Sequence, residues 1–522
     1  MTEYDKTIII GTRGSELALW QANFTKSVLE QNGFAVILKI IKTKGDQIQH
    51  LSFDKIEGKG FFTKELEEAL LANEVDLAVH SCKDLPSENP EGLTIGAYSA
   101  RANAIDVLLI NKASIADYNL LKLNPTATVG TSSSRRKAQI LAHLPGLNIK
   151  DIRGNVPTRI QKLRDGMYDA IILAAAGIER LNIDISDLVR VNLEPPFFIP
   201  AAAQGVLAFQ IRENDERMKA VCAVLHSNSG EREIGIERKI LNSFNGGCQI
   251  PLAIHCNGKD TWILKSENGS EMPKRIRTEV GVDDDSINEI VSKFNQFMPK
   301  SVFISRENNN DYLFRTLESN GFEINATALL DFKAIPFSIN EKYDWVFFSS
   351  KKGVDYFMKG IGGDNAFFET GKIAAIGKST AQYIEEQYQL KVDFIGDVNN
   401  LEDSIAEFML LNPNKILLPR GKHSMESVQK YLPKNVFSEL IVYENQPKVL
   451  LDKMESKILI FTSPLNSKSY FEHYQLDDDQ QCIAIGNSTA KCLNELGINC
   501  KIAIEPTPWA IADEVFAICM GL

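Results

Sequence analysis

The chain has 522 residues, of which 44% are hydrophobic, and a formal net charge of −11 at pH 7. At roughly 150 residues per domain, this length predicts several packed domains. No apolar stretch approaches the ~20 residues that span a bilayer, and residues 1–5 lack the basic and then apolar order of a signal peptide. These features argue against a membrane-spanning or secreted protein, and we expect a cytoplasmic one.

The charges are unevenly distributed along the chain. Residues 1–220 hold 26 Lys and Arg against 27 Asp and Glu, which leaves 31 against 41 for the rest, and they hold 11 of the 18 arginines. An acidic chain without a broad basic face does not favour nucleic acid as its main ligand. The arginines of the first part therefore predict a local anion site.

The eight cysteines include no CxxC pair and no His and Cys spacing typical of zinc, so we expect no bound metal. A disulfide framework is not expected in so large a cytoplasmic chain. Any chemically important cysteine would act alone.

Strand-like apolar runs alternate with amphipathic helical segments through the first 220 residues. The first set has strands at 7–10, 36–41 and 76–80 and helices at 16–31 and 63–72; the second has strands at 127–129, 148–152 and 170–174 and helices at 135–142 and 156–165. This alternation predicts two α/β domains facing one cleft, each a parallel sheet covered by helices, with 206–211 crossing back to the first sheet. A smaller unit with a helix and short strands follows at about 220–298.

The arginines of these two domains occur in three turns rich in Gly, Ser and Thr, at residues 11–15, 130–136 and 151–159. Each turn follows or adjoins a predicted strand, so guanidinium groups and free backbone N–H groups would gather at neighbouring strand ends. That arrangement predicts a site for a ligand with many carboxylates or phosphates. For any single arginine, a surface ion pair is the alternative.

Two further residues could take part in chemistry, and for each a purely structural role stays open. Asp84 ends a predicted buried strand beside Lys83, where its carboxylate could stabilise a cationic intermediate or cap the next turn. Cys248 lies in the glycine-containing turn at 245–251, where it would be a nucleophile, a covalent tether, or a small buried hydrophobe.

The last 220 residues contain an internal repeat. Residues 344–350 recur as 457–463, and residues 373–381 recur as 482–490. Each copy reads as strand, polar turn, helix, strand, and a Gly/Ser/Thr turn that opens another helix. Two α/β lobes follow, with hinges near 332–338 and 441–448 and polar turns that are either helix N-caps or ligand contacts.

We therefore predict five units. Domain 1 comprises 1–100 and 200–219, domain 2 comprises 101–199, domain 3 comprises 220–298, lobe 1 comprises 299–335 and 447–522, and lobe 2 comprises 336–446.

The motifs of the first half together resemble the porphobilinogen deaminase family, also called hydroxymethylbilane synthase. The matching segments are 11–22, 44–46, 58–62, 80–86, 130–136, 153–155, 204–205 and 246–251, in family order over about 250 residues. The resemblance implies two periplasmic-binding-protein-like α/β domains plus a small α+β domain. It also implies that four porphobilinogens are polymerised, with release of ammonia, on a dipyrromethane cofactor.

The resemblance assigns roles to individual residues of this sequence. Cys248 matches the cysteine that carries the cofactor through a thioether, and Asp84 matches the catalytic aspartate that pairs with pyrrole nitrogens. Each pyrrole bears an acetate and a propionate, which bidentate arginines suit better than lysines. The implied cofactor and substrate contacts are Arg13, Ser15, Lys83, Thr131, Ser133, Arg135, Arg136, Arg153, Arg159, Arg180 and Gln204.

Two positions depart from the family pattern. Ile105 stands where an arginine is expected near the domain hinge, and Ala203 replaces the glycine before Gln204. We expect altered hinge detail and retained activity.

The C-terminal repeat resembles the uroporphyrinogen-III synthase family over about residues 300–522, a two-lobed α/β module. Supporting segments are 347–350, 376–381, 417–421, 442–443, 461–464 and 506–508. The resemblance implies closure of hydroxymethylbilane with inversion of ring D and loss of water. Tyr443 matches a tyrosine that assists departure of the hydroxyl, although by default it is a packing residue, and the other implied contacts are Ser350, Thr380, Ser463 and Thr507.

The sequence thus predicts a fused enzyme of tetrapyrrole biosynthesis that acts on small molecules, without nucleic acid or membrane, and as a monomer. A tethered second enzyme would raise the local concentration of the next catalyst, and channelling is a hypothesis that follows. One alternative is a two-lobed anion-binding protein with a sensor module. Another is a deaminase whose C-terminal half only docks partners.

Overall fold

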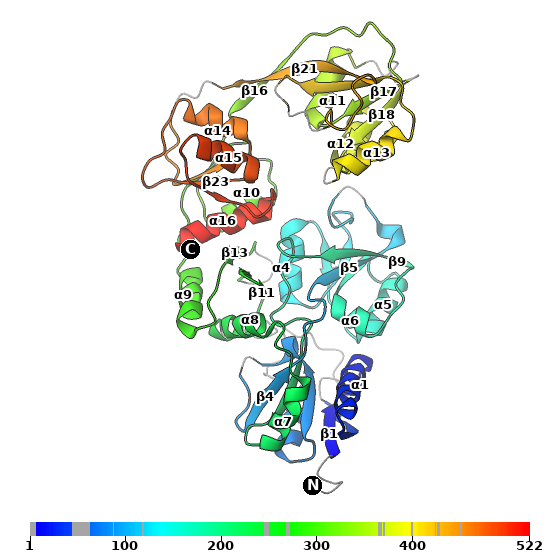
Figure 1. Ribbon diagram of the computed structural model, residues 1–522, viewed down its shortest axis with the longest axis vertical. Helices are drawn as coiled ribbons and strands as arrows, with labels where there is room; N and C mark the ends of the chain where they lie inside the picture. Colours follow the sequence, from blue (N-terminus) through cyan, green and yellow to red (C-terminus); the bar gives the residue numbers. More distant parts are fainter. Residues whose placement is uncertain are drawn as a thin grey trace.

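The computed structural model describes residues 7–43, 63–86, 88–116, 119–244, 250–267, 272–363, 368, 371–397, 400–422, 424, 428–448 and 452–522. Five units are distinct in Figure 1: domain 1 lies at the N-terminal end, domains 2 and 3 lie above it, and lobes 1 and 2 lie at the opposite end. No helix in the described part of the chain is long and apolar enough to cross a membrane.

Domain 1 is a five-stranded sheet of order β2-β1-β3-β10-β4. Its elements are β1 (Thr7–Thr12), α1 (Glu16–Gln31), β2 (Ala35–Ile40), α3 (Lys64–Leu71), β3 (Leu77–Ser81), the 3-10 turn Cys82–Asp84, β4 (Leu93–Tyr98), β10 (Leu207–Arg212) and α7 (Glu216–Leu225). Side chains of α7 join the core of this sheet. The predicted boundary at 219 falls inside α7, so this unit continues through Leu225.

Domain 2 is built on a sheet of order β7-β6-β8-β5-β9. Its elements are β5 (Asp106–Asn111), the 3-10 turn Lys112–Ser114, β6 (Thr128–Gly130), α4 (Ser134–His143), β7 (Asn148–Lys150), α5 (Val156–Arg164), β8 (Ala170–Ala174), α6 (Ala175–Arg180) and β9 (Leu188–Leu193). Apolar clusters fill both faces of this sheet, as its uniformly apolar strands require.

The predicted all-parallel sheets are wrong in one respect, because both sheets are mixed. β10 runs antiparallel to β3 and β4, and β5 runs antiparallel to β8 and β9. Each of these strands arrives from the neighbouring domain and not from a covering helix, so the right-handed crossover that makes strands parallel does not apply to it. The return of the chain to the first sheet at β10 was predicted and is confirmed.

Domain 3 is small, with one three-stranded antiparallel sheet and two helices. Its elements are α8 (Glu231–Ser243), β11 (Leu252–Asn257), β12 (Asp260–Lys265), β13 (Lys274–Thr278) and α9 (Asp284–Asn295). Alternate residues of the sheet, such as Ile254, Ile263 and Ile276, pack with α8 and α9. The opposite face of the sheet needs another cover.

The two lobes each contain one copy of the sequence repeat, which confirms that prediction. Lobe 1 has the parallel sheet β15-β14-β22-β23-β24, and lobe 2 has the sheet β16-β21-β20-β17-β18-β19. Lobe 1 comprises β14 (Val302–Ile304), α10 (Tyr312–Ser319), β15 (Ile324–Ala326), β22 (Ile458–Phe461), α14 (Pro464–Phe471), β23 (Gln481–Ala484), α15 (Asn487–Glu495), β24 (Cys500–Ile502) and α16 (Pro508–Met520). Lobe 2 comprises β16 (Leu330–Ala334), β17 (Trp345–Phe348), α11 (Lys351–Gly360), β18 (Lys372–Ile376), α12 (Lys378–Tyr388), β19 (Phe394–Gly396), α13 (Leu401–Met409), β20 (Ile416–Gly421) and β21 (Phe437–Pro447).

The connection between the lobes is a two-stranded ribbon. β16 and β21 pair antiparallel from Leu330 opposite Pro447 to Ala334 opposite Tyr443, and they run from lobe 1 to lobe 2 (Figure 1). The predicted hinge segments overlap these strands. Because both strands belong to the sheet of lobe 2, that lobe begins at about residue 330 and not at 336.

Candidate active sites

A buried carboxylate organises the arginines at the start of α4. Asp106 is fully buried and accepts hydrogen bonds from Arg135 Nη1 at 2.7 Å and from Arg136 Nη2 at 2.7 Å. Burial alone would raise the pKa of Asp106, but the charges and hydrogen bonds of the two arginines outweigh it and hold the pKa far below its usual range. The three side chains therefore carry one net positive charge.

Lys83 and Asp84 project from domain 1 toward that cluster. Both lie in the 3-10 turn that ends β3, and Lys83 Nζ donates a 3.1 Å hydrogen bond to Gln204 Oε1. Gln204 Nε2 in turn donates to Asp106 Oδ1 at 3.1 Å. Burial lowers the pKa of Lys83 to about 8, and the positive charges of Arg136 and Arg135 act in the same direction. The side chain of Asp84 is exposed, as a group that meets a ligand must be.

The turn at 151–159 adds two more cations to the site. Arg159 Nε donates to the backbone oxygen of Gly154 at 2.7 Å, which fixes its guanidinium at the start of α5. Burial, together with the smaller effects of the nearby charges of Arg136 and Arg153, lowers the pKa of Arg159 to about 10, against the opposite effect of Asp84. The arginines of domain 2 and the carboxylate of domain 1 thus lie within electrostatic reach of one another, as two facing walls require.

The remaining predicted contacts in this half have visible structural roles. Ser15 and Ser133 cap the N-termini of α1 and α4, where their hydroxyls accept from backbone N–H groups. Thr131 is buried and accepts from the Ser133 N–H. Arg180 donates to the Gly205 oxygen at 2.7 Å and lies over the Trp20 ring, so it joins domain 2 to domain 1. Arg13, from the first turn, is close enough to lower the pKa of His80, after the larger effect of burial.

The departures at Ala203 and Ile105 lie in the two segments that connect domains 1 and 2. Ala203 has φ 55°, a left-handed conformation in which a glycine carries no steric cost. Gly205, at φ 89°, is different, because a Cβ there would lie 2.6 Å from the Ala102 oxygen. Ile105 packs against the apolar core of domain 2. An arginine at this position would have to turn its charged group away from that apolar core.

Cys248 lies in the segment 245–249, outside the described residues. The chain enters this segment after Phe244, the C-cap of α8, and leaves it at Ile250 before β11. The flanking residues Phe244 and Ile250 pack in the core that contains domain 3, and the role of Cys248 stays a prediction.

In the C-terminal half, Tyr443 and Ser350 meet on lobe 2. Tyr443 is nearly buried on β21, with its ring 5.1 Å from that of Tyr356 and 5.8 Å from that of Phe332. Burial raises the pKa of the Tyr443 phenol, against a smaller opposite effect of its hydrogen bond with Ser350. A Cβ on Gly421 would lie 2.7 Å from the Tyr443 ring, so only glycine leaves room for it. Tyr443 is therefore a neutral phenol that can donate a proton.

The other predicted contacts of this half are divided between the two lobes. Thr380 is buried in the first turn of α12 on lobe 2. On lobe 1, Ser463 and Thr507 accept hydrogen bonds as the N-caps of α14 and α16. Ser350 is likewise the N-cap of α11. The N-cap alternative is thus observed for three of the four, and the Thr507 hydroxyl also donates its own hydrogen to Glu505 Oε1 at 2.9 Å.

The sequence of the first half matches characterised proteins closely. The family model described as "Porphobilinogen deaminase, dipyromethane cofactor binding domain" matches residues 8–220. The porphobilinogen deaminase of Geobacillus kaustophilus is 42% identical over 289 residues, which cover 54% of this chain and 91% of that protein. The corresponding protein of Maridesulfovibrio salexigens is 46% identical over 253 residues, 48% of this chain and 79% of that protein. The chain belongs to the porphobilinogen deaminase family.

A second domain follows the deaminase. The model described as "Uroporphyrinogen-III synthase HemD" matches residues 294–513. The crystal structure of uroporphyrinogen-III synthetase from Helicobacter pylori is 22% identical and covers 42% of this chain and 100% of that one, with a TM-score of 0.34. The chain therefore unites a deaminase, which is a transferase, and a synthase, which is a lyase, and is a bifunctional enzyme of porphyrin biosynthesis.

Sequence reasoning missed two buried carboxylates of the deaminase half. Asp106 balances one of the two positive charges of the α4 arginines. Glu237 on α8 accepts from Arg101 Nη2 and from the Ala203 N–H, each at 2.6 Å. Glu237 thereby ties domain 3 to both connecting segments. A signal existed at Asp106, where a charge opens an otherwise apolar strand, because such a charge is buried only with partners.

The lowered pKa of Lys83 predicts a pH-dependent deaminase. Lys83 is charged below a pH of about 8 and neutral above it, so its attraction for a carboxylate is present at low pH and lost as the pH rises. We expect uptake of the dipyrromethane by the apoprotein to weaken above that pH, and Lys83→Arg to remove the dependence. Fluorescence titration with dipyrromethane at several pH values measures the affinity of the wild-type apoprotein and of Lys83→Arg. If the affinity has the same pH dependence in both proteins, this role of Lys83 is contradicted.

Proposed function

We propose that residues 1–298 assemble hydroxymethylbilane on a dipyrromethane held by a thioether to Cys248, and that residues 299–522 close it to uroporphyrinogen III. The observation that carries the proposal is Asp84, an exposed carboxylate at the edge of a cluster of buried and half-buried cations. One anion among cations suits a reaction in which a carboxylate-rich substrate becomes transiently positive at one carbon.

The charged groups fit the dipyrromethane that the family implies. Burial, with a smaller effect of neighbouring arginines, holds the pKa of Lys83 and of Arg159 below their ordinary values. The cations of this surface outnumber its two carboxylates, Asp84 and Asp106, so the surface is short of negative charge. Acetate and propionate groups would supply that charge, and we propose that Lys83, Arg153 and Arg159 receive them. Arg135 and Arg136 share the Asp106 carboxylate and present the remaining N–H groups. When bound, the dipyrromethane supplies the pyrrole carbon to which porphobilinogen is joined.

We propose that Asp84 acts on the aminomethyl group of porphobilinogen. That group reacts as the ammonium, CH2–NH3⁺: its C–N bond breaks, ammonia leaves with the electron pair, and the pyrrole is left as an azafulvene cation. A carboxylate beside the pyrrole N–H stabilises this charge, and the same carboxylate can accept the proton that is lost when the new C–C bond forms.

In the synthase half, we propose that Tyr443 assists the loss of water from hydroxymethylbilane. The phenol O–H would donate to the hydroxyl as its C–O bond breaks, so that the oxygen leaves as water. Ser350, which is hydrogen-bonded to Tyr443, would orient the phenol. Thr380, Ser463 and Thr507 would position the substrate from the two lobes, since their side chains are hydroxyls at helix N-termini.

Removal of the Tyr443 hydroxyl is expected to separate the two activities. Tyr443→Phe keeps the ring packing and removes one hydrogen bond, so closure to uroporphyrinogen III should slow about tenfold, while porphobilinogen consumption stays unchanged. Because hydroxymethylbilane also closes by itself, the type I isomer should rise. Tyr431→Phe, at an exposed tyrosine of lobe 2, is the control. Equal isomer ratios in Tyr443→Phe and wild type would remove Tyr443 from the mechanism.

The pure chain should release one ammonia for each porphobilinogen consumed, and coupled assay of ammonia with depletion of the pyrrole measures this ratio. Consumption without ammonia would contradict the deaminase chemistry. We further propose that the protein is a cytoplasmic monomer whose substrates are small molecules, and light scattering of the purified chain tests the oligomeric state.

A further inference from the structure

The last helix of the synthase lies against the open face of the third deaminase domain. Residues alternate along β13, so Ile276 packs with α8 and α9 while Arg275 and Arg277 point the other way. There they meet consecutive acids of α16: Arg275 Nε donates to Asp513 Oδ1 at 2.6 Å, and Arg277 Nη2 donates to Glu514 Oε1 at 2.8 Å. In Figure 1, α16 lies between lobe 1 and β13.

Arg275 joins three units at one point. It is only 1% exposed, and besides Asp513 it donates to the Tyr312 hydroxyl of α10 at 3.1 Å and to the Pro196 oxygen of domain 2 at 2.8 Å. Burial would lower its pKa, but Asp513 and Tyr312 raise it above the ordinary value, so the guanidinium stays charged. A buried charge with partners in domain 2 and in lobe 1 links these two units to domain 3.

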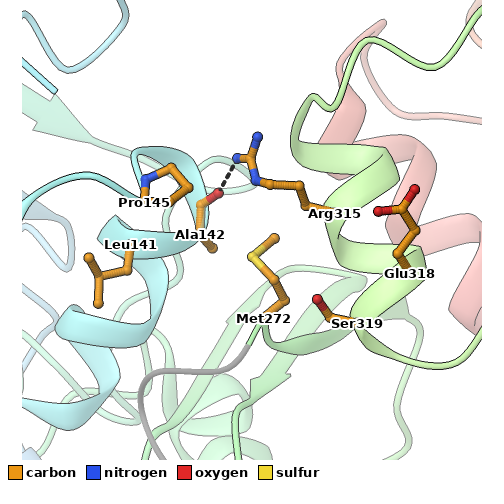
Figure 2. Close-up of a pocket in the computed structure, with 7 residues that line it drawn as sticks. All are labelled: Leu141, Ala142, Pro145, Met272, Arg315, Glu318 and Ser319. Atoms are coloured by element: carbon orange, nitrogen blue, oxygen red, sulfur yellow. Dashed lines mark hydrogen bonds between the residues drawn. The ribbon is translucent and has the colours of Figure 1, made fainter.

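A second contact joins lobe 1 directly to domain 2, at the C-terminal end of α4. The His143 ring stacks on Phe197 at 3.9 Å and on Tyr312 at 4.7 Å, with Trp509 at its edge. Arg315 Nη2 donates to the Ala142 oxygen at 2.8 Å, as Figure 2 shows.

The pocket beside this contact confirms that three units meet here. Its volume is about 250 Å³. It is lined by Leu141 and Pro145 of domain 2, Met272 of domain 3, and Arg315, Glu318 and Ser319 of α10, with Ala142 between them (Figure 2).

The sequence of α16 agrees with a helix that has partners on opposite sides. Every residue from Ala510 to Ile518 is buried, including the two acids. A helix with one face open to solvent would show a polar stripe. Here one apolar cluster contains α16 together with side chains of domain 3 and of the lobe 1 sheet, so the two enzymes share a core.

We propose that lobe 1 of the synthase is also a structural part of the deaminase, because it clamps domains 2 and 3 at a fixed relative position. α4 carries Arg135 and Arg136 at its N-terminal end and the clamp at its C-terminal end. The segment with Cys248 runs between Phe244 and Ile250, which both pack in the core that contains domain 3. The position of the cofactor attachment relative to the arginines then depends on lobe 1, a consequence that rests on the proposed role of Cys248.

The test uses full-length variants and hydrogen exchange. Asp513→Asn leaves Arg275 without its counter-charge, and we expect exchange of the β13 amides at least tenfold faster and a several-fold lower kcat for porphobilinogen consumption. Glu514→Gln weakens a partly exposed pair and should give smaller changes of the same sign. Asp477→Asn, which breaks a pair within lobe 1, should change neither.

Each outcome decides the proposal. If Asp513→Asn does not fold, Glu514→Gln carries the test. A folded variant that keeps the wild-type rate of amide exchange at β13, or the wild-type kcat for porphobilinogen consumption, would contradict the proposal that lobe 1 clamps domains 2 and 3. Because exchange is independent of turnover, faster exchange in the variants together with an inactive wild type would support the contact and reject the deaminase assignment instead.

Discussion

Asp84→Asn is expected to slow porphobilinogen consumption by a factor of ~10²–10⁴, the usual contribution of a positioned acid or base. The amide keeps the size of the side chain but loses the negative charge that we propose stabilises the azafulvene cation. The loss should fall on kcat more than on KM, because the charge develops only after ammonia begins to leave. Steady-state kinetics with porphobilinogen measures it.

The stability of Asp84→Asn should stay within about 0.5 kcal/mol of wild type, because the Asp84 side chain is exposed. Glu88→Gln removes an exposed carboxylate four residues further along and serves as the matched control. If both variants keep wild-type kcat, Asp84 is only the cap that the sequence left open as an alternative.

Cys248→Ser is expected to abolish deaminase activity altogether, since a serine oxygen cannot form the thioether. Intact mass of the wild-type protein should exceed the sequence mass by a dipyrromethane, and peptide mapping should locate the addition at Cys248. The variant should show the sequence mass alone. Cys500→Ser, at a half-buried cysteine of lobe 1, should keep both the adduct and the activity. A wild-type chain without an adduct would reject the proposed tether.

Local sequence signals predicted most of the secondary structure. The helix expected at 16–31 is α1 (Glu16–Gln31), and the strand expected at 170–174 is β8 (Ala170–Ala174). Each has a clear start: Ser15 caps the helix, and β8 is an apolar run that begins directly after Asp169. The repeat predicted two lobes for the same reason, because each copy carries its own strand and helix pattern.

Local sequence signals did not predict the contacts between segments that are distant in the chain. The arginines of α4 read as ligand groups, yet Asp106 lies about 30 residues away and takes part of their charge. Nothing in the local sequence marks the acids of α16 as buried, because their partners on β13 lie more than 230 residues earlier. Periodicity reports which face of an element is apolar and does not identify the partner that covers it. Local patterns also did not separate parallel from antiparallel neighbours at β5 and β10.

The isomer of the product made from porphobilinogen by the pure full-length chain tests the central claim most directly. After oxidation to the porphyrin, chromatography separates the type I and type III isomers. A chain that both assembles hydroxymethylbilane and closes it with inversion of ring D should give predominantly type III. Type I alone, with rapid porphobilinogen consumption, would contradict the account and leave a deaminase whose second half only docks.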